Sequence, residues 1–179
     1  MSPDLGILIL RVVVGFLFVG HGTQKLFRWF GGPGLAGMSG WLGSIGLRPR
    51  TFWAVMAGLS EAGGGLLLAL GLLTPLGALG ITAAMLVAIA TVHWGRLWAT
   101  DNGIEVPLVY LVIATAVALS GPGAYSLDAV LGLQLPMPLA WLVGTALVVA
   151  GVVTALGTAQ RPVPSLLTVT ESDAADRAA

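Results

Sequence analysis

Long apolar stretches recur along the chain and are separated by short polar or glycine-rich segments. They cover about residues 5–27, 52–73, 76–94, 104–120 and 137–157. Each comes near the roughly 20 residues that an α-helix needs to cross a bilayer, and the fourth is the shortest. The pattern predicts an all-α, polytopic membrane bundle: a four-helix core and a fifth transmembrane helix.

The connections between these stretches differ in length. Only Leu-Thr-Pro separates the second stretch from the third, so these helices are expected to be antiparallel neighbours. The first connection, residues 29–51, is rich in glycine but places apolar residues at helical spacing, which predicts a short helix lying in the membrane interface. The connection 120–136 is expected to turn at Gly121 to Gly123 and to form a brief helix capped by Ser126.

Composition supports a membrane protein and argues against other classes. Hydrophobic residues make up 56% of the chain, charged residues only 9%, and the formal net charge is zero. There is no basic stripe interleaved with aromatic residues, which argues against nucleic-acid binding. The absence of cysteine excludes disulfides, thiolate nucleophiles and cysteine-held iron–sulfur clusters. A redox role would therefore require a borrowed cofactor.

Basic residues near the ends of the predicted spans are unevenly distributed. They flank the first connection, follow the third span or lie in the C-terminal tail: Lys25, Arg28, Arg48, Arg50, Arg96, Arg161 and Arg177. With five spans these all fall on one side. The positive-inside rule then predicts a multi-pass protein of the inner or plasma membrane with its N-terminus outside and its C-terminus cytoplasmic. The polar tail, residues 159–179, is expected to be flexible.

Strongly polar side chains lie within or at the edge of the first two spans: Arg11, His21, Lys25 and Glu61. An ionised group in hydrocarbon costs about 2.5–3.5 kcal/mol on insertion scales, so such groups normally face a bundle interior and pair. On an ideal helix one arc of the first span holds Arg11, Gly15, Phe18, Gly22 and Lys25, with His21 just beyond it. One face of the second span holds Ala54, Gly58, Glu61, Gly65 and Ala69. These patterns predict a polar site between the two helices.

Estimated depths bring two of these residues within reach of each other. With a rise of 1.5 Å per residue, His21 lies about 7 Å and Glu61 about 3 Å on the cytoplasmic side of the midplane. Glu61 and His21 are therefore candidate catalytic residues, as proton-transfer or ligand contacts. Arg11 is expected to pair with Glu61 or with backbone carbonyls. The candidate cofactor-binding residues that line the pocket are Arg11, Gln24, Lys25, His93 and Glu105.

Each candidate also has a structural interpretation. Lys25 is placed where a lysine can reach lipid phosphate from a helix end. Glu61 can hold two helices together, and His93 is near enough to a helix end to be an interfacial residue. Asn102 followed by Glu105 resembles a capping box for the fourth span. Haem ligation by the two histidines, or metal binding by His21, Glu61 and His93, lacks a dedicated ligand spacing, and no metal site is predicted.

Several segments, taken in order, resemble the DoxX family. They are GFLFVGHGTQKLF at 15–27, EAGGGLLLALGLLTP at 61–75, Met85, His93-Trp94, EVPL at 105–108 and GPGAYSLD at 121–128. The resemblance covers about residues 5–132 and implies a small four-helix membrane protein of prokaryotes. It also implies a link to quinone-dependent sulfur oxidation or to membrane-bound defence against oxidative stress. The fifth span departs from the family pattern.

Three functions follow as hypotheses. The leading one is a membrane subunit of an oxidoreductase system that contacts a quinone near Glu61 and His21 and takes electrons from a redox partner protein. The second is a small-molecule or proton transporter, or a lipid-binding protein, that uses the same pocket. The third is a non-catalytic scaffold whose small-residue helix faces hold partners. The partners expected from the sequence are the lipid bilayer, a redox partner protein and further copies of the chain.

Overall fold

The computed structural model describes residues 2–133 and 138–160, and every regular element in these ranges is helical. The elements at the five predicted spans are α1 (Pro3–Phe27), α3 (Arg50–Leu70), α4 (Thr74–Ala88), α5 (Glu105–Ser120) and α7 (Leu139–Gly157). The helix α4 continues directly into the π-helix η2 (Ile89–His93). The all-α bundle is confirmed, with helix ends within a few residues of those predicted.

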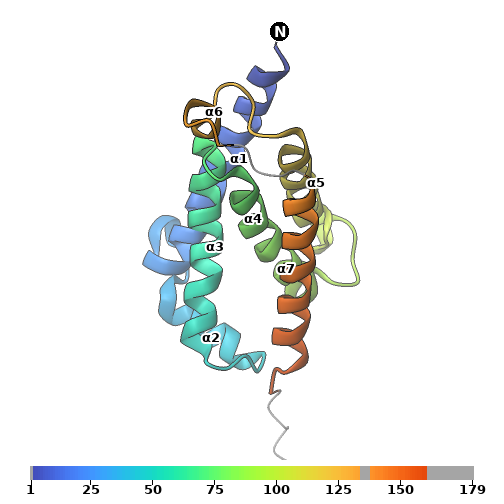
Figure 1. Ribbon diagram of the computed structural model, residues 1–179. Helices are drawn as coiled ribbons and strands as arrows, with labels where there is room; N and C mark the ends of the chain where they lie inside the picture. The colour runs from blue at the N-terminus through green and yellow to red at the C-terminus, as the bar shows by residue number, and fades with distance from the viewer. Residues whose placement is uncertain (1, 134–137, 161–179) are drawn as a thin grey trace, which may run out of the picture.

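Four of these helices are long and apolar enough to cross a membrane: α1, α3, α4 with η2, and α7. The fifth, α5, has 16 residues and is therefore about 24 Å long, shorter than a typical hydrocarbon core. It still returns the chain toward the end of the bundle that holds the N-terminus, because the following loop and α6 (Leu127–Val130) lie there (Figure 1).

The predicted interfacial segment contains a helix, α2 (Gly34–Ser44), which follows the short 3-10 turn η1 (Trp29–Gly31). It lies at the end of the bundle opposite the N-terminus, and we refer to this as the α2 end (Figure 1). Its buried Met38 and Leu42 pack with Leu47 and with Ala54 of α3. The apolar positions that suggested a helix here are therefore the ones that attach it to the bundle.

The predictions for helix starts had mixed outcomes. Ser126 caps α6 as expected, since its Oγ accepts a hydrogen bond from the Ala129 amide at 3.1 Å. The predicted capping box at Asn102 is wrong, because Asn102 has a left-handed φ of 59° and ends the 3-10 helix η3 (Ala99–Asp101). Glu105 instead accepts a hydrogen bond from the Ala99 amide at 2.8 Å. Of the predicted tail, residues from 161 onward lie outside the described ranges.

The antiparallel helices α1 and α3 approach each other closely through small residues. A Cβ atom built on Gly15 would lie 2.5 Å from the carbonyl oxygen of Gly65, and one built on Gly22 would collide with the backbone of Ala62. The whole predicted small-residue face of α3, including Glu61, is buried. Backbone contact of this kind is how helices pack without a hydrophobic driving force between them.

A single core joins five helices. Phe18 of α1, Leu68 of α3, Ile81 of α4, Val117 of α5 and Trp141 of α7 are all nearly inaccessible and belong to one cluster. The core lies in the half of the bundle nearer the N-terminus. Toward the α2 end, α3 and α7 are separated in the view of Figure 1, with α4 behind them. The cavity of the candidate site is lined by residues from this end of α3, α4 and α7.

Candidate functional site

Lys25 of α1 and Glu61 of α3 form an ion pair within the bundle. The side chain of Glu61 is 3% exposed and that of Lys25 is 27% exposed. The pairing follows from helix geometry, because Cα–Cβ bonds tilt toward the N-terminus of their own helix. In antiparallel helices, Lys25 and Glu61 therefore lean toward each other across the one-turn offset between their backbones. Sequence analysis had placed both residues at a common site but had not paired them.

Glu61 retains an unused acceptor. Its second carboxylate oxygen, Oε2, is buried and has no hydrogen-bond partner among the described residues. A buried, unpaired carboxylate oxygen is energetically unfavourable unless water or a ligand supplies a donor. Lys25 also has spare capacity, because an ammonium group carries three donors and the structure shows one of them bound to Glu61. The pair therefore retains one unsatisfied acceptor and additional donors.

The ion pair lies on the wall of a cavity of about 620 Å³. The cavity is partly open and is lined by α2, α3, α4 with η2, and α7, mostly through Ala, Val, Leu, Met and Trp side chains. Ligand pockets of about 300–1,000 Å³ with a few polar groups in an apolar wall are typical of small-molecule sites. The shape and chemistry fit an amphiphile with one polar group and an apolar body.

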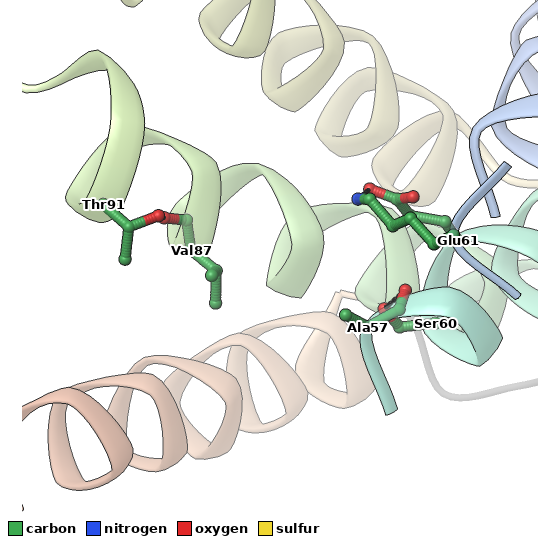
Figure 2. A network of polar contacts seen from close by, with 6 residues as sticks. Ala57, Ser60, Glu61, Val87 and Thr91 are labelled. Atoms are coloured by element: carbon green, nitrogen blue, oxygen red, sulfur yellow. Dashed lines mark hydrogen bonds and ion pairs between the residues drawn. The ribbon is translucent and has the colours of Figure 1, made fainter. Parts of the chain in front are cut away.

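The other polar side chains in the lining donate to their own helices. The hydroxyl of Ser60 donates to the carbonyl oxygen of Ala57 at 3.0 Å, and that of Thr91 donates to Val87 at 2.7 Å. Figure 2 shows these two contacts on α3 and α4, with Glu61 beside Ser60. Lys25 and Glu61 are therefore the charged side chains that the lining contributes.

The π-helix η2 contributes Thr91 and Val92 to the cavity wall. A π-helical turn inserts into an α-helix at an energetic cost and is frequently found at functional sites. The turn also ends beside His93, whose Nδ1 is 2.8 Å from the carbonyl oxygen of Asn102.

The remaining predicted residues do not line this cavity. His21 is exposed on α1, where its ring packs edge-on against Phe18 with a centroid separation of 6.0 Å. Gln24 donates to the carbonyl oxygen of Phe30 at 3.3 Å. No hydrogen bond joins His21 to Glu61 in the described part of the chain. His21 lies off the face of α1 that contacts α3, which accounts for the lack of a direct hydrogen bond; a proton-transfer role for His21 stays a prediction.

Arg11 belongs to a second polar cluster at the other end of the bundle. It is fully buried, and its Nη2 donates to the carbonyl oxygen of Tyr125 at 2.6 Å. Of its two predicted partners, the structure shows a backbone carbonyl and not Glu61. The neighbouring Gly71 is required there, because a Cβ on it would collide with the guanidinium.

Asp128 completes this cluster and was not predicted as a site residue. It is 2% exposed and accepts hydrogen bonds from the amides of Leu73 and Thr74 at 2.7 and 3.0 Å, and from the Thr74 hydroxyl at 2.7 Å. It thus caps α4 from α6, which is distant in the sequence. The available signal was the pair of unsatisfied amides expected at a Leu-Thr-Pro turn.

Within residues 2–133 and 138–160, no three His, Asp or Glu side chains lie together in a way that could hold a metal ion. The histidines that suggested haem or metal binding are each engaged locally, His21 with Phe18 and His93 with Asn102. The candidate site is consequently the cavity with its ion pair.

Comparison with known proteins agrees with the resemblance found in the sequence. Searches of curated proteins and of solved structures found no match to the chain. The family model described as DoxX matches residues 6–94, which span α1 through η2 and include both Lys25 and Glu61. Helices α5 and α7 lie outside the matched residues. With its apolar helices and this match, the chain belongs to the DoxX family and is a small integral membrane protein.

Proposed function

We propose that this protein binds a quinone, or a similar lipid-soluble carrier, in the cavity between α2, α3, α4 and α7. The observation that carries the proposal is the buried Glu61 Oε2, which lacks a partner beside a lysine in an otherwise apolar cavity. The reduced, quinol form of such a carrier would satisfy this acceptor with a ring hydroxyl and bury its body against the alanine and valine side chains.

Lys25 and Glu61 would make different contacts with the ligand. Lys25 would donate a hydrogen bond to a ligand carbonyl, and Glu61 would accept one from a ligand hydroxyl. The apolar walls would exclude water and so strengthen both contacts. A bound quinone would supply the electron-accepting chemistry. We therefore propose a membrane subunit of an oxidoreductase system, working with a redox partner protein that delivers electrons.

The proposal is tested with purified protein in lipid nanodiscs. Trp41 and Trp53 line the cavity, so quinone binding should quench tryptophan fluorescence. We expect Lys25→Met to weaken the binding of decylubiquinone, and Glu61→Gln to weaken that of its reduced form decylubiquinol, each by about tenfold, or 1.4 kcal/mol. Asp101→Asn is the matched acid-to-amide control, since Asp101 is exposed and lies outside the cavity. Wild-type affinity in both cavity variants would refute the proposed site.

A second candidate is a transporter or lipid-binding protein without redox chemistry. It is favoured by the extent of the apolar lining, which would accept a lipid-like molecule as readily as a ring. Flux of a weak acid into proteoliposomes that is lost in Glu61→Gln and unaffected by decylubiquinone would support this function over the first.

We also propose that the α2 end faces the cytoplasm of a cell with a plasma or inner membrane. The described basic residues other than Arg11 all lie toward that end: Lys25, Arg28, Arg48, Arg50 and Arg96. Such clustering marks the cytoplasmic side. Because the chain has no cysteine, single cysteines at Ser44 and Ala124 can be labelled in intact cells with a membrane-impermeant maleimide. Labelling at 124 and not at 44 is expected, and the reverse would invert the orientation.

A further inference from the structure

Helix α7 is attached to the bundle at its two ends. Near its start, Trp141 is buried in the shared core, and a Cβ on Gly144 would collide with Leu79 of α4. After its end, the amide of Gln160 donates to the carbonyl oxygen of Gly46 at 2.9 Å. Leu156 also packs against the cluster formed by α2 and the start of α3. Both attachments hold α7 at a fixed distance from α3.

Between these attachments α7 faces the cavity. Val148, Gly151, Val152, Ala155 and Leu156 form its part of the lining. Only 6% of the α7 span is buried, compared with 33% of α3, so α7 is much less covered by the rest of the protein. No heavy atom lies within 4 Å of a Cβ built on Gly151, which therefore faces open space inside the lining. From Val148 to Leu156 the helix rises about 12 Å.

The polar group and this wall occupy different parts of the cavity. Glu61 and Lys25 come from α1 and α3, whereas α7 contributes only apolar side chains and one glycine. A ligand whose head contacts the ion pair and which also contacts α7 must therefore carry an apolar extension. The cavity is partly open, and its lining includes residues of both α3 and α7, the two helices that stand apart in Figure 1.

We infer that the ligand carries a long apolar tail, that this tail lies along α7 beside Gly151, and that it reaches the bilayer between α3 and α7. The inference rests on the proposed function and adds to it the class of ligand and a specificity-determining position. The family match ends at residue 94, so this wall is supplied by a part of the chain outside the matched region. The size of residue 151 then determines how large a tail is accepted.

The experiment compares two ligands that share a head group, decylubiquinone and the tail-less ubiquinone-0, in nanodiscs. Gly151→Phe should lower the affinity for decylubiquinone by at least about tenfold, or 1.4 kcal/mol, while leaving that for ubiquinone-0 unchanged. Gly157→Phe is the matched control, because Gly157 lies on the same helix, also has open space at its Cβ, and is outside the cavity lining. It should leave both affinities unchanged.

Outcomes separate the inference from the function on which it rests. If the wild type binds both compounds and Gly151→Phe binds them equally well, the tail does not lie along α7 and the inference is overturned, while the site at Glu61 stands. If the wild type binds neither compound, the quinone function fails and the inference fails with it. Gly151→Leu is the control for misfolding. If the affinity for decylubiquinone falls moderately in Gly151→Leu and further in Gly151→Phe, while thermal stability stays constant, the larger side chain excludes the tail sterically.

Discussion

Gly15 of α1 and Gly65 of α3 lie opposite each other where the two helices cross. A Cβ atom on either residue would lie 2.5 Å from the carbonyl oxygen of the other. This contact sets the spacing and the register of the helices that carry Lys25 and Glu61. The geometry of the ion pair therefore depends on two residues without side chains.

Substituting Gly65 tests this crossing. Gly65→Ala should destabilise the protein by about 1–3 kcal/mol, because the added methyl group collides with the backbone of α1. Gly63→Ala is the control on the same helix, where nothing lies within 4 Å of the added atom. It should stabilise by up to about 1 kcal/mol through helix propensity. Unfolding in detergent, followed by circular dichroism, measures both. Equal effects would contradict close packing at Gly65.

The Lys25–Glu61 pair is expected to behave non-additively. Lys25→Met alone should cost roughly 1–3 kcal/mol, since it leaves the Glu61 carboxylate buried without its cation; the partial exposure of Lys25 keeps the cost below that of a fully buried pair. The double variant Lys25→Met, Glu61→Leu should recover most of this loss. A double-mutant cycle from unfolding midpoints measures the coupling. Additive losses would show that the two charges do not interact.

Asp128 should be important for stability although it lies in α6, a helix of only four residues. Asp128→Ala removes the acceptor of three hydrogen bonds at the start of α4 and leaves buried donors unsatisfied, at an expected cost of about 3 kcal/mol. Asp101→Ala, at an exposed position, should change stability by less than about 0.5 kcal/mol. Thermal unfolding of the two variants in the same detergent provides the comparison. A small effect at Asp128 would mean that water replaces the carboxylate.

Trp141 should account for much of the attachment of α7. It is 4% exposed in the core, so Trp141→Ala is expected to cost about 3–5 kcal/mol. The adjacent Leu142 is 60% exposed, and Leu142→Ala should be nearly neutral because its side chain would contact lipid. Comparing their melting temperatures checks this. Protease cleavage within α7 should also become faster in Trp141→Ala but not in Leu142→Ala. Unchanged cleavage in Trp141→Ala would argue against docking of α7 on the core through this side chain.

Most of the helical architecture could be predicted from sequence. Runs of apolar residues determine helix ranges because an unsatisfied backbone cannot remain in hydrocarbon. The recurrence of Gly58, Glu61 and Gly65 at helical spacing predicted the buried face of α3, and Ser126 predicted the start of α6. Local signals of this type act within a few turns of one helix. They were less successful at Asn102, where the left-handed backbone of a loop replaced the expected cap.

The pairing of side chains was decided by tertiary structure. Sequence placed Arg11, His21 and Lys25 on or near one side of α1 but left open which of them would meet Glu61. The answer depends on the register set by Gly15 and Gly65, and on the tilt of side chains toward the N-terminus of each helix. Lys25 leans toward Glu61 and Arg11 leans away from it, toward Tyr125. Helical periodicity specifies the face of a residue, whereas the offset between two helices exists only once their backbones are in contact.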